Sequence, residues 1–313
     1  LDVETSENSI QESIAQIYIQ ILYAAESVKV NESTLQVSIA QRDRGQELLN
    51  AGSIAKSDLA QLEAQVSTDR YQLVTAQATL QDYKLQLKQL LELDGENEMN
   101  VYLPALSDEN VLLPLPTKKD VYMSALTLRP EIEASKLSVE ASELGIDIAK
   151  AGYLPTISLS AGIGTNHTSG SDFTFGEQVK NGWNNSIGVS VSVPIFNNRQ
   201  TKSAVQKAKL QRETSLLSLL DEQKTLYKTI EGLWLDANSA QQRYAAANEK
   251  LKSTQISYDL ISEQFNLGMK NTVELLTEKN NLLQAQQEQL QAKYMAILNT
   301  QLLKFYQGDK LAL

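Results

Sequence analysis

One long stretch limits the folds open to this chain: residues from about 199 to 266 contain no proline and one glycine, Gly232. Its apolar and small residues recur at alternating steps of four and three residues, which is a 3.5-residue repeat typical of helices that wrap around partner helices. A helix of this length spans on the order of 100 Å, which no globular core requires. The stripe consists of Leu226, Ile230, Leu233, Ala237, Ala240, Tyr244, Ala247, Leu251, Thr254, Tyr258, Ile261 and Phe265.

The same repeat occupies two earlier stretches, 8–49 and 54–92. The break between them is Asn50-Ala51-Gly52-Ser53, and glycine ends a helix in a left-handed conformation without steric cost. We expect Ser53 or Ser57 to cap the returning helix, and Asp69 is the one polar interruption of its stripe. Two long helices with a short break predict an antiparallel helical hairpin over 1–92. The stripe residues are Ile10, Ile14, Ile17, Ile21, Ala24 and Val28, then Leu59, Leu62, Val66, Leu73, Ala76, Leu80, Tyr83, Leu87 and Leu90.

The middle of the chain changes character twice. Residues 93–119 carry the turn signal Asp94-Gly95 and three prolines, which predicts an irregular connector. A helix is expected from about 118–120 to 152, with a kink or a restart at Arg129-Pro130-Glu131, because proline suits the first helical turn.

Within residues 153–197, the period of the hydrophobic pattern changes to two. Polar and apolar residues alternate over 156–164 and 186–193, with a polar loop at about 165–185, which predicts a β-hairpin. Each strand has the length that a tilted strand needs to cross a bilayer. The same alternation would separate core from solvent in a soluble sandwich, so it leaves both interpretations open. The apolar face, expected to point outward into the membrane, consists of Ile157, Leu159, Ile163, Ile187, Val189, Val191 and Val193.

The composition excludes several classes of function. The absence of cysteine rules out disulfides, thiolate metal sites and thiol nucleophiles. With 28 basic and 38 acidic residues, the chain has a net charge of −10 and lacks the excess of basic residues that is typical of nucleic-acid-binding proteins. No Gly-rich phosphate loop, no nucleophile beside a base and no run of 18 apolar residues occurs. We therefore expect no catalysis, no cofactor, no metal and no transmembrane helix.

Four residues of the hairpin loop have two interpretations each. Phe173, Phe175 and Trp183 could form an aromatic girdle at a membrane interface or could simply pack within the loop. His167 is the single histidine, and a solvent-facing role is favoured over metal binding.

The chain contains an internal repeat. Asn50-Ala51-Gly52 through Asp58-Leu59 is similar to Asn266-Leu267-Gly268 through Glu274-Leu275, at an offset of 216 residues. A second helical hairpin is therefore expected over 198–306, followed by a short tail at 307–313. The first copy is the shorter one, so we expect the chain to begin inside a repeat, with roughly 100 further residues and a targeting signal upstream in a fuller protein.

The order of these elements resembles the outer-membrane efflux protein family, the TolC-like channels. The resemblance rests on Arg129-Pro130-Glu131, Tyr153-Leu154-Pro155, Val193-Pro194-Ile195-Phe196 and the two glycine turns, and it spans essentially the whole chain. Members of this family form trimers in which each protomer gives two β-hairpins to a shared outer-membrane barrel and long helices to a periplasmic tunnel. This chain departs from them in having one β-hairpin.

The resemblance implies a mainly α fold of antiparallel coiled-coil hairpins, of the α-barrel type, with one amphipathic transmembrane β-hairpin. It implies a passive exit duct in the outer membrane of a Gram-negative bacterium, within a tripartite efflux or type I secretion system. Its partners would be two further copies of the chain, a periplasmic adaptor, an inner-membrane transporter acting indirectly, and outer-membrane lipid. A periplasmic adaptor or coiled-coil spacer without a pore, or a spectrin-like scaffold, is the alternative.

The resemblance also points to residues at the helix tips. Asp58 and Glu274 either stabilise helix N-termini, as carboxylates commonly do, or face the pore as part of a periplasmic gate. Lys270 matches a basic residue that ties the closed tips together, while the family's second acidic position falls on Thr277. An adaptor would dock on the tips themselves, at Gly52, Ser53, Phe265, Gly268 and Met269.

Overall fold

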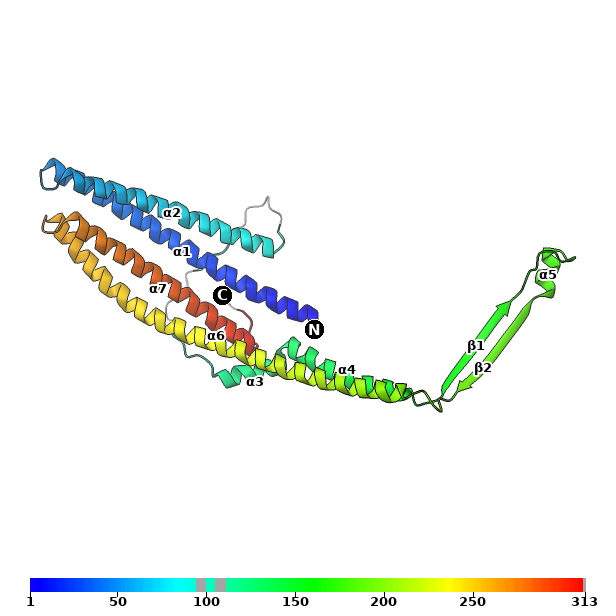
Figure 1. Cartoon of the computed structure of the whole chain (residues 1–313). Coiled ribbons are helices and arrows are strands. Elements are labelled where there is room, and N and C mark those ends of the chain that lie inside the picture. The colour runs from blue at the N-terminus through cyan, green and yellow to red at the C-terminus, as the bar shows by residue number, and fades with distance from the viewer. Residues whose placement is uncertain (94–99, 105–110, 312–313) are drawn as a thin grey trace. The chain divides into compact units, whose positions relative to one another are not determined.

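The computed structural model describes residues 1–93, 100–104 and 111–311. Long helices lie at both ends of the chain and a β-hairpin lies between them, as the sequence predicts (Figure 1). The elements are α1 Asp2–Asn50, α2 Lys56–Leu90, α3 Lys118–Leu128, α4 Pro130–Ala151, β1 Thr156–Gly164, α5 Phe175–Asn181, β2 Asn184–Ser192, α6 Gln200–Asn266 and α7 Thr272–Gln307. Two compact units emerge, one from 1–133 together with 223–313 and one from 134–222.

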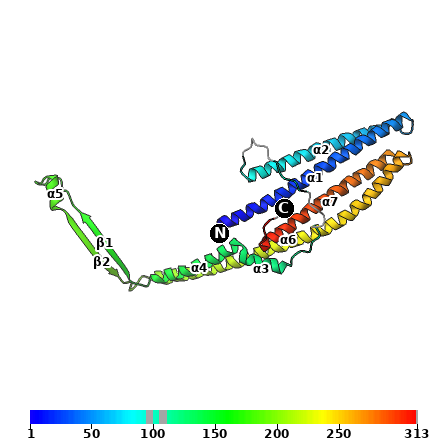
Figure 2. The same ribbon diagram turned by 180° about the vertical axis from the view of Figure 1, so that it is seen from behind.

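The first unit is built from two helical hairpins. α1 and α2 run antiparallel, as do α7 and the part of α6 that belongs to this unit, and both glycine turns lie at the same end (Figures 1 and 2). The 3.5-residue repeat correctly identifies the packed face, because every stripe residue of α6 is buried or half-buried. In α2 the stripe, Asp69 included, also points inward, whereas Ile10 of α1 is exposed.

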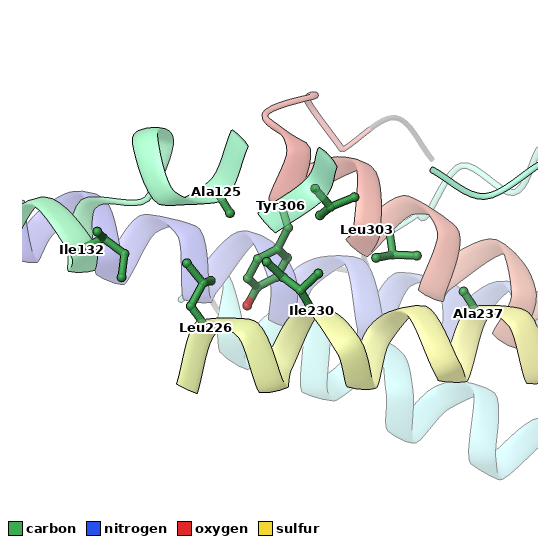
Figure 3. Packing of buried hydrophobic residues seen from close by; sticks show 8 residues of the cluster. Ala125, Ile132, Leu226, Ile230, Ala237, Leu303 and Tyr306 are labelled. Carbon is green, nitrogen blue, oxygen red and sulfur yellow. The ribbon is translucent and has the colours of Figure 1, made fainter. Parts of the chain in front are cut away.

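A compact apolar cluster joins α3 and the start of α4 to α6 and α7. Ala125 and Ile132 meet Ile230 and Leu303 there, and each of these four side chains is essentially fully buried (Figure 3). Val121, Leu226, Ala237 and Tyr306 complete the cluster. Burying such side chains stabilises the fold by about 1.5–3 kcal/mol for each large one.

Arg129 secures the same region. Its guanidinium forms an ion pair with Glu12 of α1 at 2.8 Å and lies 3.8 Å from the ring centroid of Tyr306 in α7. The helix expected up to 152 is divided at this residue, because Arg129 is extended (φ −79°, ψ 125°) and Pro130 starts α4. Of the two alternatives at Arg129-Pro130-Glu131, the restart is confirmed.

The second unit contains α4, the β-hairpin and the first part of α6. Arg212 of α6 forms an ion pair with Glu143 of α4 at 2.7 Å, and the hydroxyls of Ser142 and Ser215 lie 2.7 Å apart. β1 and β2 pair antiparallel over their full length, from Thr156 opposite Ser192 to Gly164 opposite Asn184. Across the described ranges, no helix has both the length and the apolarity for crossing a membrane.

Several sequence-based boundaries need correction. The loop expected at 165–185 contains the short helix α5, because the Glu177 carboxylate accepts hydrogen bonds from the N–H and the hydroxyl of Thr174 and so closes a first turn. β2 begins two residues earlier than expected and ends before Val193. The Asp94-Gly95 turn and much of the 93–119 connector lie outside the described residues, as do the last two residues of the tail.

Candidate functional site

The two glycine turns have the same backbone geometry. Gly52 and Gly268 both adopt φ +74°. The N–H after each glycine donates to the carbonyl five residues back at 2.8 Å, from Ser53 to Leu48 and from Met269 to Gln264. This is the Schellman arrangement, in which a left-handed residue satisfies the last carbonyls of a helix. The repeat found in the sequence is therefore also a repeat of hydrogen bonds.

Glu274 closes the start of α7. Its carboxylate accepts a hydrogen bond from the N–H of Asn271 at 3.2 Å, while the Asn271 side chain accepts one from the Glu274 N–H at 2.9 Å. This reciprocal pair is a capping box. Lys270 Nζ also lies 2.5 Å from Glu274 Oε1, and both side chains are partly exposed. The hydrogen bond from Lys270, and then the one from Asn271, lowers the pKa of Glu274 below its ordinary range.

The first tip has only half of this arrangement. Asp58 Oδ2 accepts from the N–H of Ala55 at 3.0 Å, but Ala55 is the N-cap and has no side chain that could return a hydrogen bond. The expectation that Ser53 or Ser57 caps α2 is wrong, because the turn places Ala55 at the cap. Asp58 and Glu274 thus both act as helix-start carboxylates, which agrees with the simpler of their two interpretations.

Four of the five expected docking residues are exposed at the tips. Gly52, Ser53, Gly268 and Met269 are accessible, with Met269 71% exposed. Phe265 must be removed from this surface, because it is 2% exposed and packs in the apolar cluster that joins the two hairpins. The other buried members of that cluster are Leu48, Leu62 and Leu275. The two tips of one chain are therefore held together by side chains.

The sequence analysis missed a charged cluster inside the helical hairpins. Asp69 of α2 and Lys279 of α7 form an ion pair with almost no exposed side-chain surface, and both contact the hydroxyl of Ser38 in α1. The available signal was the polar interruption at Asp69. A carboxylate at a core position of a heptad repeat requires a buried partner.

The β-hairpin presents one apolar face and one polar face. Residues directly opposite in an antiparallel pair point to the same side, and Ile157 is opposite Val191, as Leu159 is opposite Val189. Ser158 and Ser190 lie opposite each other on the other face. The seven apolar residues expected to point outward are 59–82% exposed, although Val193 lies just beyond the end of β2. In the described part of the chain, nothing packs on this apolar face.

The loop between the strands has its own polar contacts. His167 Nδ1 lies 3.1 Å from Gln178 Oε1, and the His167 ring meets that of Phe175 edge-on at 5.2 Å. Phe173, Phe175 and Trp183 are each about 60% exposed. Within the described ranges, no group of three histidine or acidic side chains is positioned to hold a metal ion.

The sequence matches a family model described as "Outer membrane efflux protein" over residues 121–308. It is 25% identical over 294 residues to the outer membrane efflux protein BepC of Brucella suis, covering 93% of this chain and 61% of BepC. It is 25% identical over 311 residues to the outer membrane protein TolC of Escherichia coli, covering 95% of this chain and 60% of TolC. The chain thus spans about three fifths of the length of these relatives.

Solved structures show the same fold at lower identity. A structure of CusC aligns with a TM-score of 0.82 at 19% identity and covers 98% of this chain and 70% of that one. The open state of the MtrE outer membrane channel of Neisseria gonorrhoeae aligns with a TM-score of 0.75 at 18% identity and covers 97% of this chain and 66% of that one. At this identity the structures support the fold, which over the described residues is mainly helical with a single β-hairpin.

Proposed function

We propose a function from the premise that this chain belongs to the outer membrane efflux protein family. The protein acts as a passive exit duct in the outer membrane of a Gram-negative bacterium, as part of a tripartite efflux or secretion system. It carries solutes from the periplasm to the exterior and catalyses no reaction. The family match favours this function over a periplasmic adaptor, a coiled-coil spacer or a spectrin-like scaffold.

The observation that carries the proposal is the exposed apolar face of the β-hairpin. Isolated strands with unpaired edges are not stable in lipid, because each free backbone group costs several kcal/mol. The hairpin must therefore join other hairpins to close a barrel, with its apolar face toward lipid and its serine face toward the lumen. Strands of nine residues match the length that a tilted strand needs to cross the hydrocarbon core. A trimer is the assembly that the family suggests.

The periplasmic gate is proposed at the second tip. In a trimer with its axis near this tip, three Glu274 carboxylates would form a ring that attracts cations. Each carboxylate already has a partner in Lys270 of its own chain, which neutralises part of that charge. A polar contact between the tips of neighbouring copies would therefore require Lys270 or Glu274 to leave its partner in its own chain and bind one in the next chain. Exposed pairs of this kind contribute little individually, about 0–1 kcal/mol each.

The adaptor-docking surface is proposed at the exposed residues of the two turns, Gly52, Ser53, Gly268 and Met269. These tips carry small or flexible side chains that suit the close approach of a helical partner. An inner-membrane transporter would act through such an adaptor and supply the energy for export.

The experiment is single-channel conductance of the full-length protein in planar bilayers. Lys270→Ala and Glu274→Ala should each raise the conductance, since either change removes an ionic contact at the tip. The matched control is Lys252→Ala or Glu249→Ala, which removes an exposed ion pair within α6, away from the turns. Protein that inserts into lipid but conducts no ions would contradict the duct itself. Conductance that is unchanged in both tip variants would contradict only the gate assignment.

A further inference from the structure

The contact between the two helical hairpins has apolar clusters at its ends, and in its middle it also contains a group of buried polar residues. At the tips it consists of the cluster around Phe265, and further along it consists of a second cluster that includes Ile19, Leu290 and Tyr294. Between these clusters lie polar residues that are buried to a similar degree. They are Asn31, Thr34 and Ser38 of α1, Asp69 of α2 and Lys279 of α7, all less than 10% exposed.

Two of these five residues satisfy their hydrogen bonds within their own helix. The side chains of Asn31 and Thr34 donate to carbonyls four residues back in α1, at 2.7 and 2.8 Å. Ser38 differs, because its hydroxyl connects two other helices. It donates to Asp69 Oδ2 and accepts from Lys279 Nζ.

The ion pair completes the connection among three helices. Lys279 Nζ also donates to Asp69 Oδ2, so α1, α2 and α7 share one network of hydrogen bonds. The second carboxylate oxygen, Asp69 Oδ1, accepts from Gln65 Nε2 at 2.9 Å. With 1% and 3% of their side-chain surfaces exposed, Asp69 and Lys279 cannot exchange these partners for water without separation of the helices. Burial lowers the pKa of Lys279, which agrees with an ammonium group held away from solvent.

The pair is not a feature that the internal repeat carries twice. The residue 216 positions after Asp69 is Ala285, and the residue 216 positions before Lys279 is Glu63. Ala285 is fully buried and cannot form an ion pair. Each copy of the repeat therefore supplies one member of the pair, and the counterpart positions, Glu63 and Ala285, do not form a second pair of this kind.

A buried ion pair contributes little net stability, because desolvation offsets most of the attraction. Its better-attested effect is to select one alignment of helices, since any other alignment leaves a buried charge without its partner. Heptad stripes of leucine and alanine discriminate poorly between alignments that differ by one helical turn. A three-helix polar contact in the middle of such stripes excludes those alternatives.

We propose that Ser38, Asp69 and Lys279 form a register latch that fixes the second hairpin against the first. The second tip can then move along or away from the first only by separating a buried ion pair. The latch lies within one chain and does not depend on the proposed channel. If the channel assignment also holds, the latch restrains the tip that carries Lys270 and Glu274.

The test measures the distance between the two tips within one chain. Because the chain has no cysteine, Ser53→Cys and Met269→Cys place spin labels at two exposed positions, and labelled protein is diluted with unlabelled protein so that only intrachain pairs contribute. Pulsed electron paramagnetic resonance then gives the distance distribution. The test variant is Asp69→Leu with Lys279→Met, which replaces both charged side chains by apolar ones and so removes both charges together.

We expect the test variant to retain its helicity and thermal unfolding temperature but to show a broader distribution or a second population, displaced by about one helical turn, roughly 5 Å. The control is Lys250→Met with Glu288→Leu, which removes a half-exposed ion pair between α6 and α7 and should leave the distribution unchanged. An unchanged distribution in the folded test variant would overturn the proposal, and so would equal broadening in the control. A test variant that no longer folds would also overturn it, because the pair would then be required for folding and not for register.

Discussion

At the scale of single residues, the second tip needs one residue for its backbone conformation and another for its charge. Gly268 adopts a left-handed backbone conformation, and a Cβ built on it would meet no atom within 4 Å. The conformation, and not a lack of space, is therefore the reason for a glycine at this position. Glu274, six residues later, is required for its carboxylate, which caps α7 and pairs with Lys270. Both residues were identified from the sequence, and each was given a structural and a functional interpretation.

Replacing Gly268 tests the conformational argument. Gly268→Ala should destabilise the protein by about 1–2 kcal/mol, because a Cβ in the left-handed region approaches the following carbonyl oxygen. Gly232 is the matched control, since it lies inside α6 and its Cβ would also meet open space. Gly232→Ala should stabilise by up to about 1 kcal/mol, because alanine favours a helix. Urea unfolding followed by helical circular dichroism measures both, and shifts of the same sign would contradict the argument.

The pH dependence of the second tip follows from Glu274. Its folded-state pKa is lowered from 4.5, so the contribution of the charged carboxylate is fully present above pH 4.5 and is lost as the pH falls through the folded pKa. Hydrogen exchange of the first-turn amides of α7, corrected for intrinsic rates, should show this loss of protection. In Lys270→Met the pKa should move back toward its ordinary value and the loss should begin at higher pH. An identical pH profile in the variant would show that Lys270 is not the cause.

At the scale of elements, the helix starts differ more than the helix ends. Both hairpins end their first helix with the same hydrogen bonds around glycine, yet α7 begins with a complete capping box and α2 begins with Ala55. A stripe of apolar residues decides which face of a helix is buried, but it says little about which residue forms the cap. Ser53 and Ser57 were reasonable cap candidates, and the path of the turn selected neither.

Substitutions can exchange the N-cap residues of α7 and α2. Asn271→Ala removes the side chain that accepts from the Glu274 N–H and should destabilise by about 1 kcal/mol. Ala55→Asn supplies the missing acceptor at the first tip and should stabilise by a similar amount. Thermal unfolding of both variants is the measurement. A stabilising effect of Asn271→Ala, or no effect of Ala55→Asn, would contradict the assignment of these caps.

At the scale of the whole molecule, the chain combines surfaces that need different surroundings. The first unit buries apolar clusters between its helices, whereas the β-hairpin exposes an apolar face in the described structure. A face of this kind in water is a site for association or for lipid. The proposed duct accounts for it, because closure with further hairpins would satisfy the strand edges and place the face against lipid.

The two faces of the hairpin should respond differently to charge. Leu159→Arg places a cation on the apolar face near the middle of β1 and should cost about 2–4 kcal/mol in a bilayer. Ser158→Arg places the same cation on the polar face and should be tolerated in a water-filled lumen. The fraction of full-length protein recovered in the outer membrane distinguishes them. Equal loss for both variants would contradict the orientation of the hairpin, and equal tolerance would contradict its burial in lipid.

The long helices and both strands of this protein could be predicted from the amino-acid sequence, because they follow from local rules. The 3.5-residue stripes, the glycine breaks and the alternation over 156–164 each depend on residues close together in the chain, and the 216-residue repeat showed that two hairpins exist. Which side chains meet across the hairpins became visible only in the folded chain. It placed Phe265 in a core and brought Ser38, Asp69 and Lys279 into one network. Such contacts join residues up to 241 positions apart, and no local pattern encodes the alignment of one helix against another that creates them.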